Sequence, residues 1–354
     1  MTELGLRDLR KRPKIELHGH IDGYLSPSDI QTIARKNRRR ITTLDGRVIN
    51  TKNQLLDFWK GDGYQNILQQ IVSRFSPVIS LMQTENAIRD TAVAYVRRLA
   101  EDGIVYAEGR FAPQFHTREG LTMNDAVRSI LEGLREGYEH YGVRTSLTIC
   151  INRESPSSVG DDVARVALGW VGRGVVALDL ACNENGFPPE RHLSAYRMTF
   201  DSTLRRTVHA GEGAFNLTEN LRNIRTAIQL LRANGLGHAI HLACDEGLLQ
   251  LVKDREIRIE SNPVSNLTVG HITNMRELQL DKLLKESVMV SVNSDDPAMW
   301  PHGTLSENLY AVTKAYGFDL NNLRELILNA CRSAFASERE RAELAVNVSN
   351  SWKD

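Results

Sequence analysis

The sequence predicts an α/β protein, a (β/α)8 TIM barrel with extra helices inserted between strands one and two. Two observations predict this fold: eight short apolar runs along 354 residues, and segments of helical period between them from about Ile104 onward. Strands that alternate with helices form a parallel sheet, and eight such units close into a barrel. We therefore expect reactive residues to gather at one mouth, where the carboxyl ends of the strands meet.

The candidate strands are the eight apolar runs themselves. They span residues 14–20, 104–111, 144–150, 174–181, 205–210, 235–242, 256–261 and 288–294. The segment from Thr84 to Asp102 illustrates the helices, because its apolar residues recur at spacings of four, three and four, at Ile88, Ala92, Tyr95 and Leu99. Thr84 suits the N-cap of this helix, and Gly103 suits the position after its last turn.

The residues from about Ser26 to Gly103 separate strand one from strand two. They are expected to be helical and to form an insertion over the barrel mouth. No linker, low-complexity tract or repeat divides the chain, so residues 1–354 are expected to form a single barrel domain.

The charge balance and the cysteines narrow the choice of partners and compartment. The chain has 44 basic and 44 acidic side chains, which gives no reason to expect nucleic acid or a membrane surface as a partner. The cluster Arg38–Arg40 is expected to be a solvated helix end. The four cysteines form no CxxC pair, as is typical of reduced thiols in the cytoplasm. No apolar leader or membrane-length stretch occurs, so we expect a soluble cytoplasmic protein. The sequence does not determine its oligomeric state.

Reactive side chains occur at the ends of four candidate strands. In KIELHGHIDG, residues at every second position project from the same face of a strand. The other three strand ends are VHAGEG, GLGHAIHL and VNSDDP. Together they supply His18, His20, Asp22, His209, Glu212, His238, His241, Asp295 and Asp296.

The chemistry of this set favours a metal site. Three neutral imidazoles and one carboxylate suit a borderline metal such as zinc, which lowers the pKa of a bound water to about 7. A leaving group or ring nitrogen also needs a proton, which Glu212 can donate if burial raises its pKa. The plainer alternatives are a polar strand end for the HxH pair, a helix-start carboxylate for Glu212, and a capping pair before Pro297 for the two aspartates.

Four segments in this order, LHGHIDG, VHAGE, GLGH and SVNSDDP, resemble the signature segments of the adenosine deaminase family in the amidohydrolase superfamily. Three further segments agree with that order, at residues 105–116, 179–190 and 260–270. The resemblance covers nearly the whole chain. It implies a metal-dependent hydrolase barrel that deaminates adenosine, or a close adenosine derivative, to inosine and ammonia in purine metabolism.

The resemblance also implies a role for each site residue. One zinc ion per chain is bound by His18, His20, His209 and Asp295. Glu212 protonates purine N1, and His238 orients the attacking hydroxide and helps remove its proton. The implied substrate contacts are His20, Asp22, Cys182 and Asp296. Of these, Asp22 holds a ribose hydroxyl, Asp296 accepts a hydrogen bond at N7, and the backbone at Cys182 faces N3.

Three positions depart from the family pattern and leave the exact substrate open. Cys182 stands where the family has Gly, Asn262 stands where Cys is common, and the AMWPHGT segment around Trp300 differs from the usual short run. Relatives that act on free adenine tend to carry Glu where this chain has Asp22, which favours a nucleoside.

Other functions remain as alternatives. One is a deaminase of another 6-aminopurine, such as adenine, aminodeoxyfutalosine or an N6-modified adenine nucleoside or nucleotide. A second is an amidohydrolase that cleaves an amide, ester or lactone, although the fourth strand ends at Cys182 without the lysine that bridges two metals in many such enzymes. A third, from another class, is an inactive nucleoside-binding protein.

The remaining histidines are expected to have surface or packing roles. His241 is expected to be a core histidine, and His302 is near the mouth without a clear role. No partner is identified for His116, His140, His192 and His271.

Overall fold

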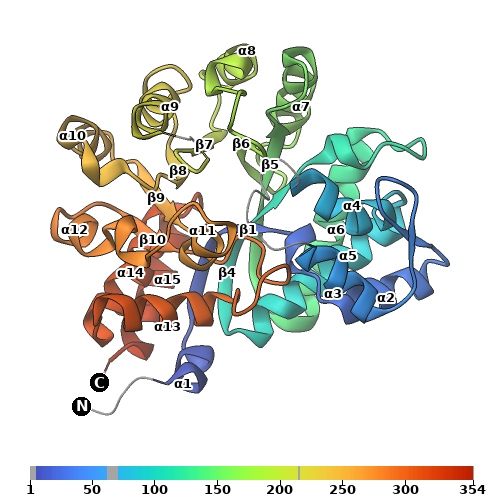
Figure 1. The fold of residues 1–354 in the computed structure, drawn as a ribbon, viewed down its shortest axis with the longest axis horizontal. Helices are drawn as coiled ribbons and strands as arrows, with labels where there is room; N and C mark the ends of the chain where they lie inside the picture. Colours follow the sequence, from blue (N-terminus) through green and yellow to red (C-terminus); the bar gives the residue numbers. More distant parts are fainter. Residues whose placement is uncertain (1–4, 62–70, 214–215, 354) are drawn as a thin grey trace.

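The computed structural model describes residues 5–61, 71–213 and 216–353. Eight parallel strands, in the order β1-β4-β5-β6-β7-β8-β9-β10, form a nearly closed barrel surrounded by helices (Figure 1). This confirms the predicted fold class. The strands are β1 Lys14–His20, β4 Ile104–Phe111, β5 Arg144–Asn152, β6 Val175–Ala181, β7 Arg205–Ala210, β8 Gly235–His238, β9 Arg258–Ser261 and β10 Val290–Val292.

The seam between β1 and β10 is joined by side chains and by the segment after β10. The Leu17 backbone N–H donates to Oδ1 of Asn293 at 3.0 Å, and the Ser294 N–H donates to a carboxylate oxygen of Glu16 at 3.0 Å. At the mouth, the His20 N–H donates to the carbonyl of Asp295 at 3.0 Å. The first and last strand ends are thus held together, which brings two of the candidate site segments into contact.

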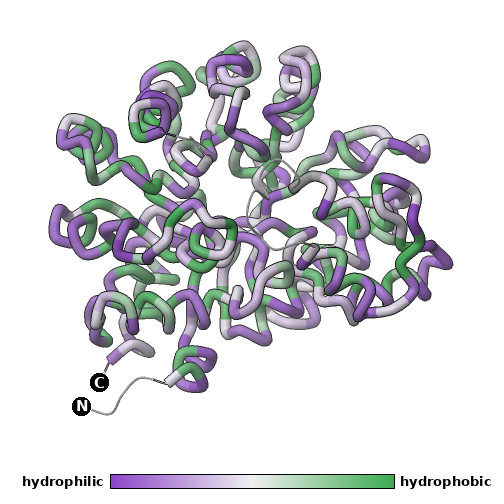
Figure 2. The backbone as a smooth tube through the Cα atoms, in the orientation of Figure 1, coloured by the Kyte–Doolittle hydropathy of each residue, from purple (hydrophilic) through white to green (hydrophobic). Residues whose placement is uncertain are grey.

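Helices cover the outside of the sheet, and each has one buried face. Figure 2 shows apolar and polar stretches alternating along these helices, as expected when one face packs on the sheet. The insertion ends with α5 Glu85–Glu101. The helices that follow it are α6 Met123–Tyr141, α7 Ser157–Gly169, α8 Leu193–Arg197, α9 Leu217–Gln229, α10 Glu246–Asp254, α11 Pro263–Val269, α12 Leu280–Lys285, α13 Leu305–Tyr316, α14 Leu320–Ser333 and α15 Glu338–Ser351.

The prediction for the helix after Thr84 is confirmed. The Thr84 side chain caps α5 by accepting from the Ala87 N–H, and Gly103 has a positive φ of 72° just after the helix. Only glycine adopts this conformation without strain, so the chain turns there directly into β4.

The insertion is only partly helical, which corrects the sequence-based expectation. It holds α2 Pro27–Lys36, α3 Lys52–Lys60 and α4 Ile71–Leu81, but also a two-stranded antiparallel hairpin formed by β2 Ile41–Thr42 and β3 Val48–Ile49. The segment 43–47 forms the turn of this hairpin, where Gly46 has a φ of 82°. Residues 62–70 of the predicted insertion lie outside the described residues. The position of α4 over the barrel mouth confirms the rest of the expectation, because Phe75 and Ile79 line the pocket there.

Three strands are shorter than predicted. The run 235–242 was expected to be extended throughout, but β8 ends at His238, where φ is 65°, and Ala239 follows with a φ of 46°. Ala239, Ile240 and Leu242 are buried in the turn beyond the strand, so hydropathy alone does not mark its end. Likewise β9 begins at Arg258 and β10 covers only Val290–Val292.

Both ends of the described chain pack at the amino-terminal face of the barrel. α1 Leu6–Lys11 precedes β1, and the Trp352 indole after α15 donates to the Pro13 carbonyl at 2.8 Å. A continuous buried apolar cluster runs from Leu9 to Trp352. Among the helices that the structure describes, none combines the length and apolar character needed to cross a bilayer.

Candidate active site

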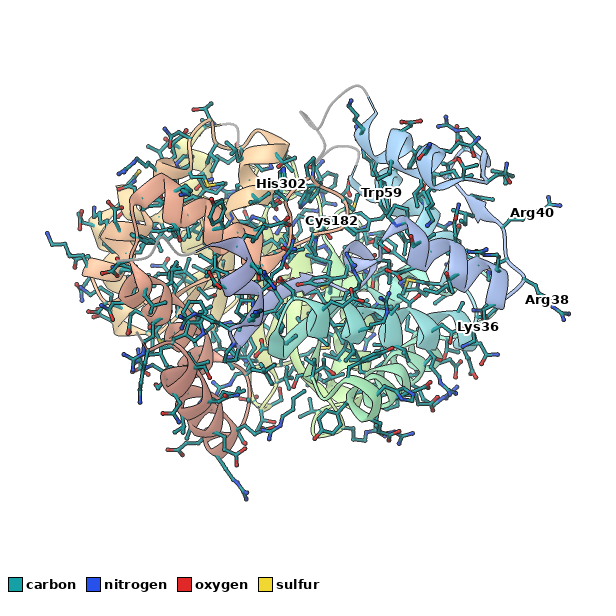
Figure 3. The ribbon with its side chains drawn as sticks, turned by 90° about the horizontal axis from the view of Figure 1, so that it is seen from below. Lys36, Arg38, Arg40, Trp59, Cys182 and His302 are labelled. Atoms are coloured by element: carbon teal, nitrogen blue, oxygen red, sulfur yellow. The ribbon has the colours of Figure 1, made fainter. Side chains whose placement is uncertain are left out.

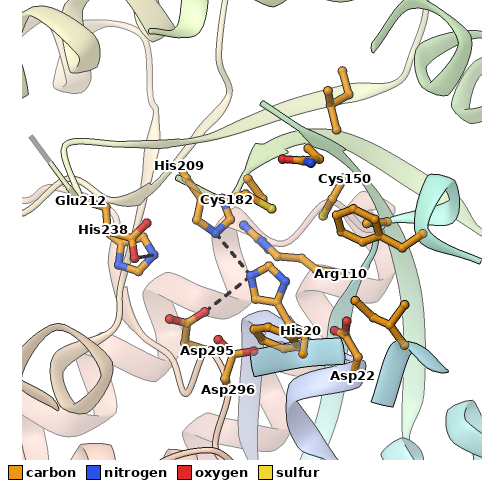
Figure 4. Close-up of a pocket in the computed structure, with 17 residues that line it drawn as sticks. His20, Asp22, Arg110, Cys150, Cys182, His209, Glu212, His238, Asp295 and Asp296 are labelled. Atoms are coloured by element: carbon orange, nitrogen blue, oxygen red, sulfur yellow. Dashed lines mark hydrogen bonds and ion pairs between the residues drawn. The ribbon is translucent and has the colours of Figure 1, made fainter. Parts of the chain in front are cut away.

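The carboxyl ends of the strands enclose a pocket with an empty volume of about 660 Å³ (Figure 4). One side of it is apolar, with Phe75 and Ile79 from α4 and Phe115 from the segment after β4. The other side carries eight of the predicted site residues. They are His20, Asp22, Cys182, His209, Glu212, His238, Asp295 and Asp296.

Imidazole nitrogens converge at the floor of this pocket. Nε2 of His209 lies 3.0 Å from Nε2 of His18 and 3.3 Å from Nε2 of His20. Oδ1 of Asp295 lies 3.5 Å from Nε2 of His20 and 3.7 Å from Nε2 of His18. One set whose ligand atoms all lie within 4.8 Å of one another consists of His18, His209, His238 and Asp295. The predicted ligands therefore meet, and His238 lies in the same cluster.

The donor chemistry of this cluster fits a bound cation. Nδ1 of His18 donates to Oε2 of Glu260 at 2.8 Å, and Nδ1 of His209 donates to Asp179 at 3.0 to 3.2 Å. A neutral imidazole carries one N–H, so both Nε2 atoms present lone pairs to each other. Burial lowers the pKa of His18 and keeps its ring neutral. Facing lone pairs repel, and a metal ion at the centre removes this repulsion.

Two carboxylates and an arginine that the sequence analysis missed hold these imidazoles. Arg110, fully buried at the end of β4, donates to Asp179 at 3.0 Å, to Glu260 and to the Leu17 carbonyl at 2.8 Å. Burial opposes ionisation of Asp179, but its interactions with His209 and Arg110 outweigh burial and hold the pKa of Asp179 well below its usual range. The Asp179 carboxylate therefore stays ionised and accepts the Nδ1–H of His209, and Glu260 accepts the Nδ1–H of His18.

A third missed carboxylate fixes the turn that carries Glu212. Glu184 accepts backbone N–H bonds from Gly211, Glu212 and Gly213 at 3.0, 2.8 and 3.1 Å, and the Asn223 amide at 2.9 Å. The Glu212 side chain projects into the pocket. Burial raises its pKa well above the usual value, and the nearby charges of Asp295 and Glu184 act in the same direction. Glu212 is therefore suited to carry a proton.

His238 lies between Glu212 and the imidazole cluster. Its Nδ1 lies 2.8 Å from the Asn266 amide nitrogen, and its Nε2 lies 3.5 Å from Oε1 of Glu212. Asn262, which replaces a common family cysteine, contacts the same Nδ1 at 3.4 Å. Because both amides are donors, Nδ1 of His238 accepts, and the ring proton is on Nε2, which faces the pocket.

Asp22 lies across the pocket from Glu212, and Asp296 lies beside Asp295 (Figure 4). Burial raises the pKa of Asp22 to about 6, and it raises the pKa of Asp296 well above its usual value together with the charge of Asp295. Oδ1 of Asp296 is buried without a hydrogen-bond partner among the described residues. Gly23 is required beside it, since a Cβ there would lie 1.9 Å from that oxygen.

Strained backbone occurs at three of these strand ends. Cys182, His238 and Asp295 have φ values of 76°, 65° and 62°, which non-glycine residues rarely adopt. Such strain is typical of functional sites. At Cys182 the conformation that glycine provides in the family pattern is thus retained, with a thiol added to the pocket wall.

The cluster, the pocket and the fold can now be compared with known proteins. A family model described as adenosine deaminase matches residues 13–351. The chain belongs to the adenosine deaminase family. Adenosine deaminase of Mycobacterium marinum is 30% identical over 363 aligned positions, covering 98% of this chain and 97% of that protein. Membership places the protein among hydrolases that act on C–N bonds.

Solved structures support this placement within the amidohydrolase fold. Adenine deaminase from Arthrobacter aurescens superposes with a TM-score of 0.84 at 26% identity, covering 96% of this chain and 98% of that chain. A zinc-bound amidohydrolase from Burkholderia ambifaria gives a TM-score of 0.80 at 20% identity, with coverages of 99% and 94%, and shares the fold.

The histidines without assigned roles divide into three groups in this deaminase-family chain. His116 and His192 are buried, and each contacts a backbone carbonyl, as expected of packing residues. His302 is 84% exposed and is not among the pocket residues. The arginines of the 38–40 cluster are also remote from the pocket, since Arg38 and Arg40 point into solvent far from Cys182 (Figure 3). His271 was expected to have no partner, but its Nε2 lies 4.0 Å from Oε1 of Glu212. The loop after α11 folds back onto the mouth, a contact between segments that the sequence pattern does not show.

Proposed function

We propose that this protein is a zinc-dependent deaminase that hydrolyses adenosine, or a close adenosine derivative, to an inosine product and ammonia. The observation that carries the proposal is the cluster of facing imidazole nitrogens beside a buried carboxyl group of raised pKa, in a pocket at the barrel mouth. Family membership supports the reaction class.

The proposed metal ligands are His18, His20, His209 and Asp295. Zinc is favoured by the nitrogen-rich donor set, and an amidohydrolase of the same fold carries zinc. When bound, the ion supplies Lewis acidity and lowers the pKa of a water molecule. The ligand oxygen of Asp295 is supported from behind, because the Ser265 hydroxyl donates to its other oxygen at 2.7 Å. We assign the fourth imidazole, His238, to the water rather than to the ion, since its Nε2 also faces Glu212 at 3.5 Å.

The remaining residues act on the substrate and on protons. Glu212 donates its proton to purine N1, which makes C6 electrophilic. His238 orients the attacking water through its Nε2–H, and the proton removal first expected of it is not proposed, because its Nδ1 already accepts from Asn266. The water oxygen bonds to C6, one water proton returns to the Glu212 carboxylate, and the other passes to the amino group, which leaves as ammonia when the C6–N bond breaks. Asp296 is proposed to donate to N7, contrary to the acceptor role first expected, because N7 of a purine nucleoside has no hydrogen and burial raises the pKa of Asp296. Asp22 and His20 hold the sugar, and the backbone at Cys182 faces N3.

The substrate is proposed to be a nucleoside rather than a free base or a nucleotide. Asp22 is short enough to leave room for a ribose and would lie unpaired against a free base, at a cost of about 1–3 kcal/mol. The one basic side chain among the described pocket residues that is always charged is Arg110, and its guanidinium is already bonded to Asp179 and Glu260. A 5′-phosphate therefore finds no free cation in this lining.

Adenine is the second candidate substrate, because the solved structure with a TM-score of 0.84 is an adenine deaminase. We propose a small-molecule partner and no nucleic-acid partner. A single catalytic domain and a cytoplasmic location stay predictions, the latter because all four thiols are free.

The test is elemental analysis followed by ammonia release from adenosine, 2′-deoxyadenosine, adenine, adenosine 5′-monophosphate and adenosines modified at N6 or the 5′ position. We expect close to one divalent metal per chain, and the highest kcat/KM for adenosine or a modified adenosine. Two metals per chain would contradict the mononuclear site. A higher kcat/KM for adenine or the monophosphate would overturn the role of Asp22, and no ammonia from any aminopurine would favour the inactive binding protein.

A further inference from the structure

The Glu212 carboxyl group is flanked by two imidazoles, and only one of them is used in the proposed reaction. On one side is Nε2 of His238, at 3.5 Å from Oε1 of Glu212. On the other side is Nε2 of His271, at 4.0 Å from the same oxygen. The two nitrogens come from different segments, the end of β8 and the loop after α11.

We infer that His271 is a positioning residue that holds Oε1 of Glu212, so that the other carboxyl oxygen faces the purine ring. The inference rests on the proposed function, since it concerns the geometry of the proton donor. It assigns a role to a histidine that is not among the pocket residues and touches neither the metal ligands nor the substrate.

The burial of the His271 ring is the first support. Its side chain is 16% exposed, and its Nε2 is buried with no hydrogen-bond partner among the described residues. A buried polar atom without a partner costs about 1–3 kcal/mol, so such atoms call for an explanation. Oε1 of Glu212 lies 4.0 Å from this nitrogen, so the inferred hydrogen bond requires the two side chains to approach each other by about 1 Å.

The rigidity of the segment that carries His271 is the second support. The His271 backbone N–H donates to the Asn266 carbonyl at 2.9 Å, just after the left-handed Gly270 that ends α11. The side-chain amide of the same Asn266 contacts Nδ1 of His238 at 2.8 Å. One residue of α11 therefore contacts the His238 ring and also holds the backbone that carries the His271 ring.

The way in which Glu212 itself is held is the third support. Glu184 fixes the backbone of the turn through three N–H groups, which leaves only the side-chain torsions of Glu212 free. Two glycines border Glu212 and contribute no side chains that could restrict it. A bond from His271 to Oε1 removes this remaining freedom and directs the proton donor at one ring nitrogen.

The experiment compares His271→Leu and His271→Gln with the wild type, with His241→Leu as the matched control. His241 is a partly buried imidazole of the neighbouring β8–α10 connection and is not among the pocket residues. We expect His271→Leu to lower kcat by about 10-fold, a part of the 10²–10⁴ that a general acid contributes, with KM, metal content and inosine binding unchanged. His271→Gln keeps an N–H near Oε1 and should recover most of kcat, and His241→Leu should match the wild type.

A kcat within twofold of the wild type in His271→Leu would overturn the inference, and so would an equal loss of kcat in His271→Gln or in His241→Leu. Loss of metal in His271→Leu would also overturn it, since the role would then concern the ion. If His271→Leu does not fold, the comparison of His271→Gln with His271→Phe decides in the same way, because phenylalanine fills the space without an N–H. A wild-type chain that releases no ammonia overturns the proposed function first, whereas an active wild type with unaffected variants overturns this inference alone.

Discussion

At the scale of single residues, Glu212 differs from an ordinary surface carboxylate in two ways. Its backbone is held by Glu184, and burial raises the pKa of its side chain well above the usual value. Glu212→Gln keeps the shape of the side chain and removes the transferable proton. We expect kcat to fall by about 10²–10⁴, with metal content unchanged by elemental analysis.

The proton on Glu212 also sets a pH dependence with a definite sign. The acid is active while it is protonated, so kcat/KM should decline as pH rises through the raised pKa of Glu212, on the alkaline side of the normal range for glutamate. The Glu212→Gln variant should lack this alkaline decline in its residual activity. Near-normal turnover in that variant would show that the proton comes from another group.

Cys182 has a strained backbone conformation, and its thiol lines the pocket. The effects of these two features on stability and on substrate binding can be measured separately. Its φ of 76° costs a non-glycine residue about 1–2 kcal/mol, so Cys182→Gly should raise the free energy of unfolding by about 1 kcal/mol. Removal of the thiol should also widen the pocket and change KM for aminopurines. Arg38→Gly is the control, because Arg38 has a φ of 53° but is exposed and far from the pocket. It should stabilise without changing KM, and equal KM values in both variants would show that the thiol does not touch the substrate.

At the scale of secondary-structure elements, a single histidine links the segment after β4 to the end of α4. The His116 ring stacks on Phe111 at 4.7 Å, and its Nδ1 donates to the Met82 carbonyl at 3.0 Å. Burial lowers the pKa of His116 from 6.5 to about 3. Between these pH values the unfolded chain binds a proton that the folded chain does not. The contribution of His116 to the free energy of unfolding is therefore full above about pH 6.5 and is lost as pH falls toward 3.

We therefore expect the difference in free energy of unfolding between the wild type and His116→Phe to depend on pH. At pH 7.5 the variant should be less stable by about 1 kcal/mol, because the bond to Met82 is lost. At pH 5 this difference should shift by about 2 kcal/mol in favour of the variant, because phenylalanine does not titrate. Denaturant unfolding at both pH values measures the shift, and a difference that is independent of pH would contradict the lowered pKa of His116.

The buried charges form a second connection between elements. Arg258 on β9 bonds to Glu108 on β4 at 2.6 Å and to Glu260 at 2.7 Å, and Glu260 bonds to His18 on β1 at 2.8 Å. Arg110 then joins Glu260 to Asp179, which holds His209 on β7. Removing one member of such a buried series leaves an unpaired charge. Substitution of any of these residues is therefore expected to lower the stability of the fold.

At the scale of the whole molecule, the proposed metal should stabilise the barrel mouth, because it would bind the facing imidazole nitrogens. A metal that binds the folded chain alone stabilises it by RT ln(1 + [L]/Kd), about 4 kcal/mol at a thousandfold excess over Kd. A chelator should therefore lower Tm by several degrees, and added zinc should restore it.

His18→Ala serves as the control for that measurement. It removes one ligand and the repulsion between Nε2 of His18 and Nε2 of His209, so its Tm should not depend on chelator or zinc. An unchanged Tm in a wild-type chain shown by elemental analysis to have lost its metal would contradict the proposed site.

The sequence by itself determined the barrel and the residues at its mouth. The reason is that the relevant rules are local: side chains alternate along a strand, and the carboxyl ends of parallel strands lie at the same end of the barrel. The sequence thus predicted that four residues far apart along the chain lie close together, namely His18, His20, His209 and Asp295. The same local rules failed at two places. They did not predict the hairpin at residues 41–49, and they placed the end of β8 too late, because the apolar run continues after the backbone turns at His238.

Only the tertiary structure decided which groups support those residues. Glu260 and His18 are 242 positions apart, and their contact depends on strand register and side-chain rotamers that no sequence pattern encodes. The same holds for Glu184, which supports the turn of Glu212, for Asn266 in α11, and for His271 on the loop after α11. Gly237 gives the physical reason in one position, since a Cβ there would lie 2.5 Å from Cε1 of His18. The site forms because neighbouring strands leave that space empty, and this is a property of the packed barrel.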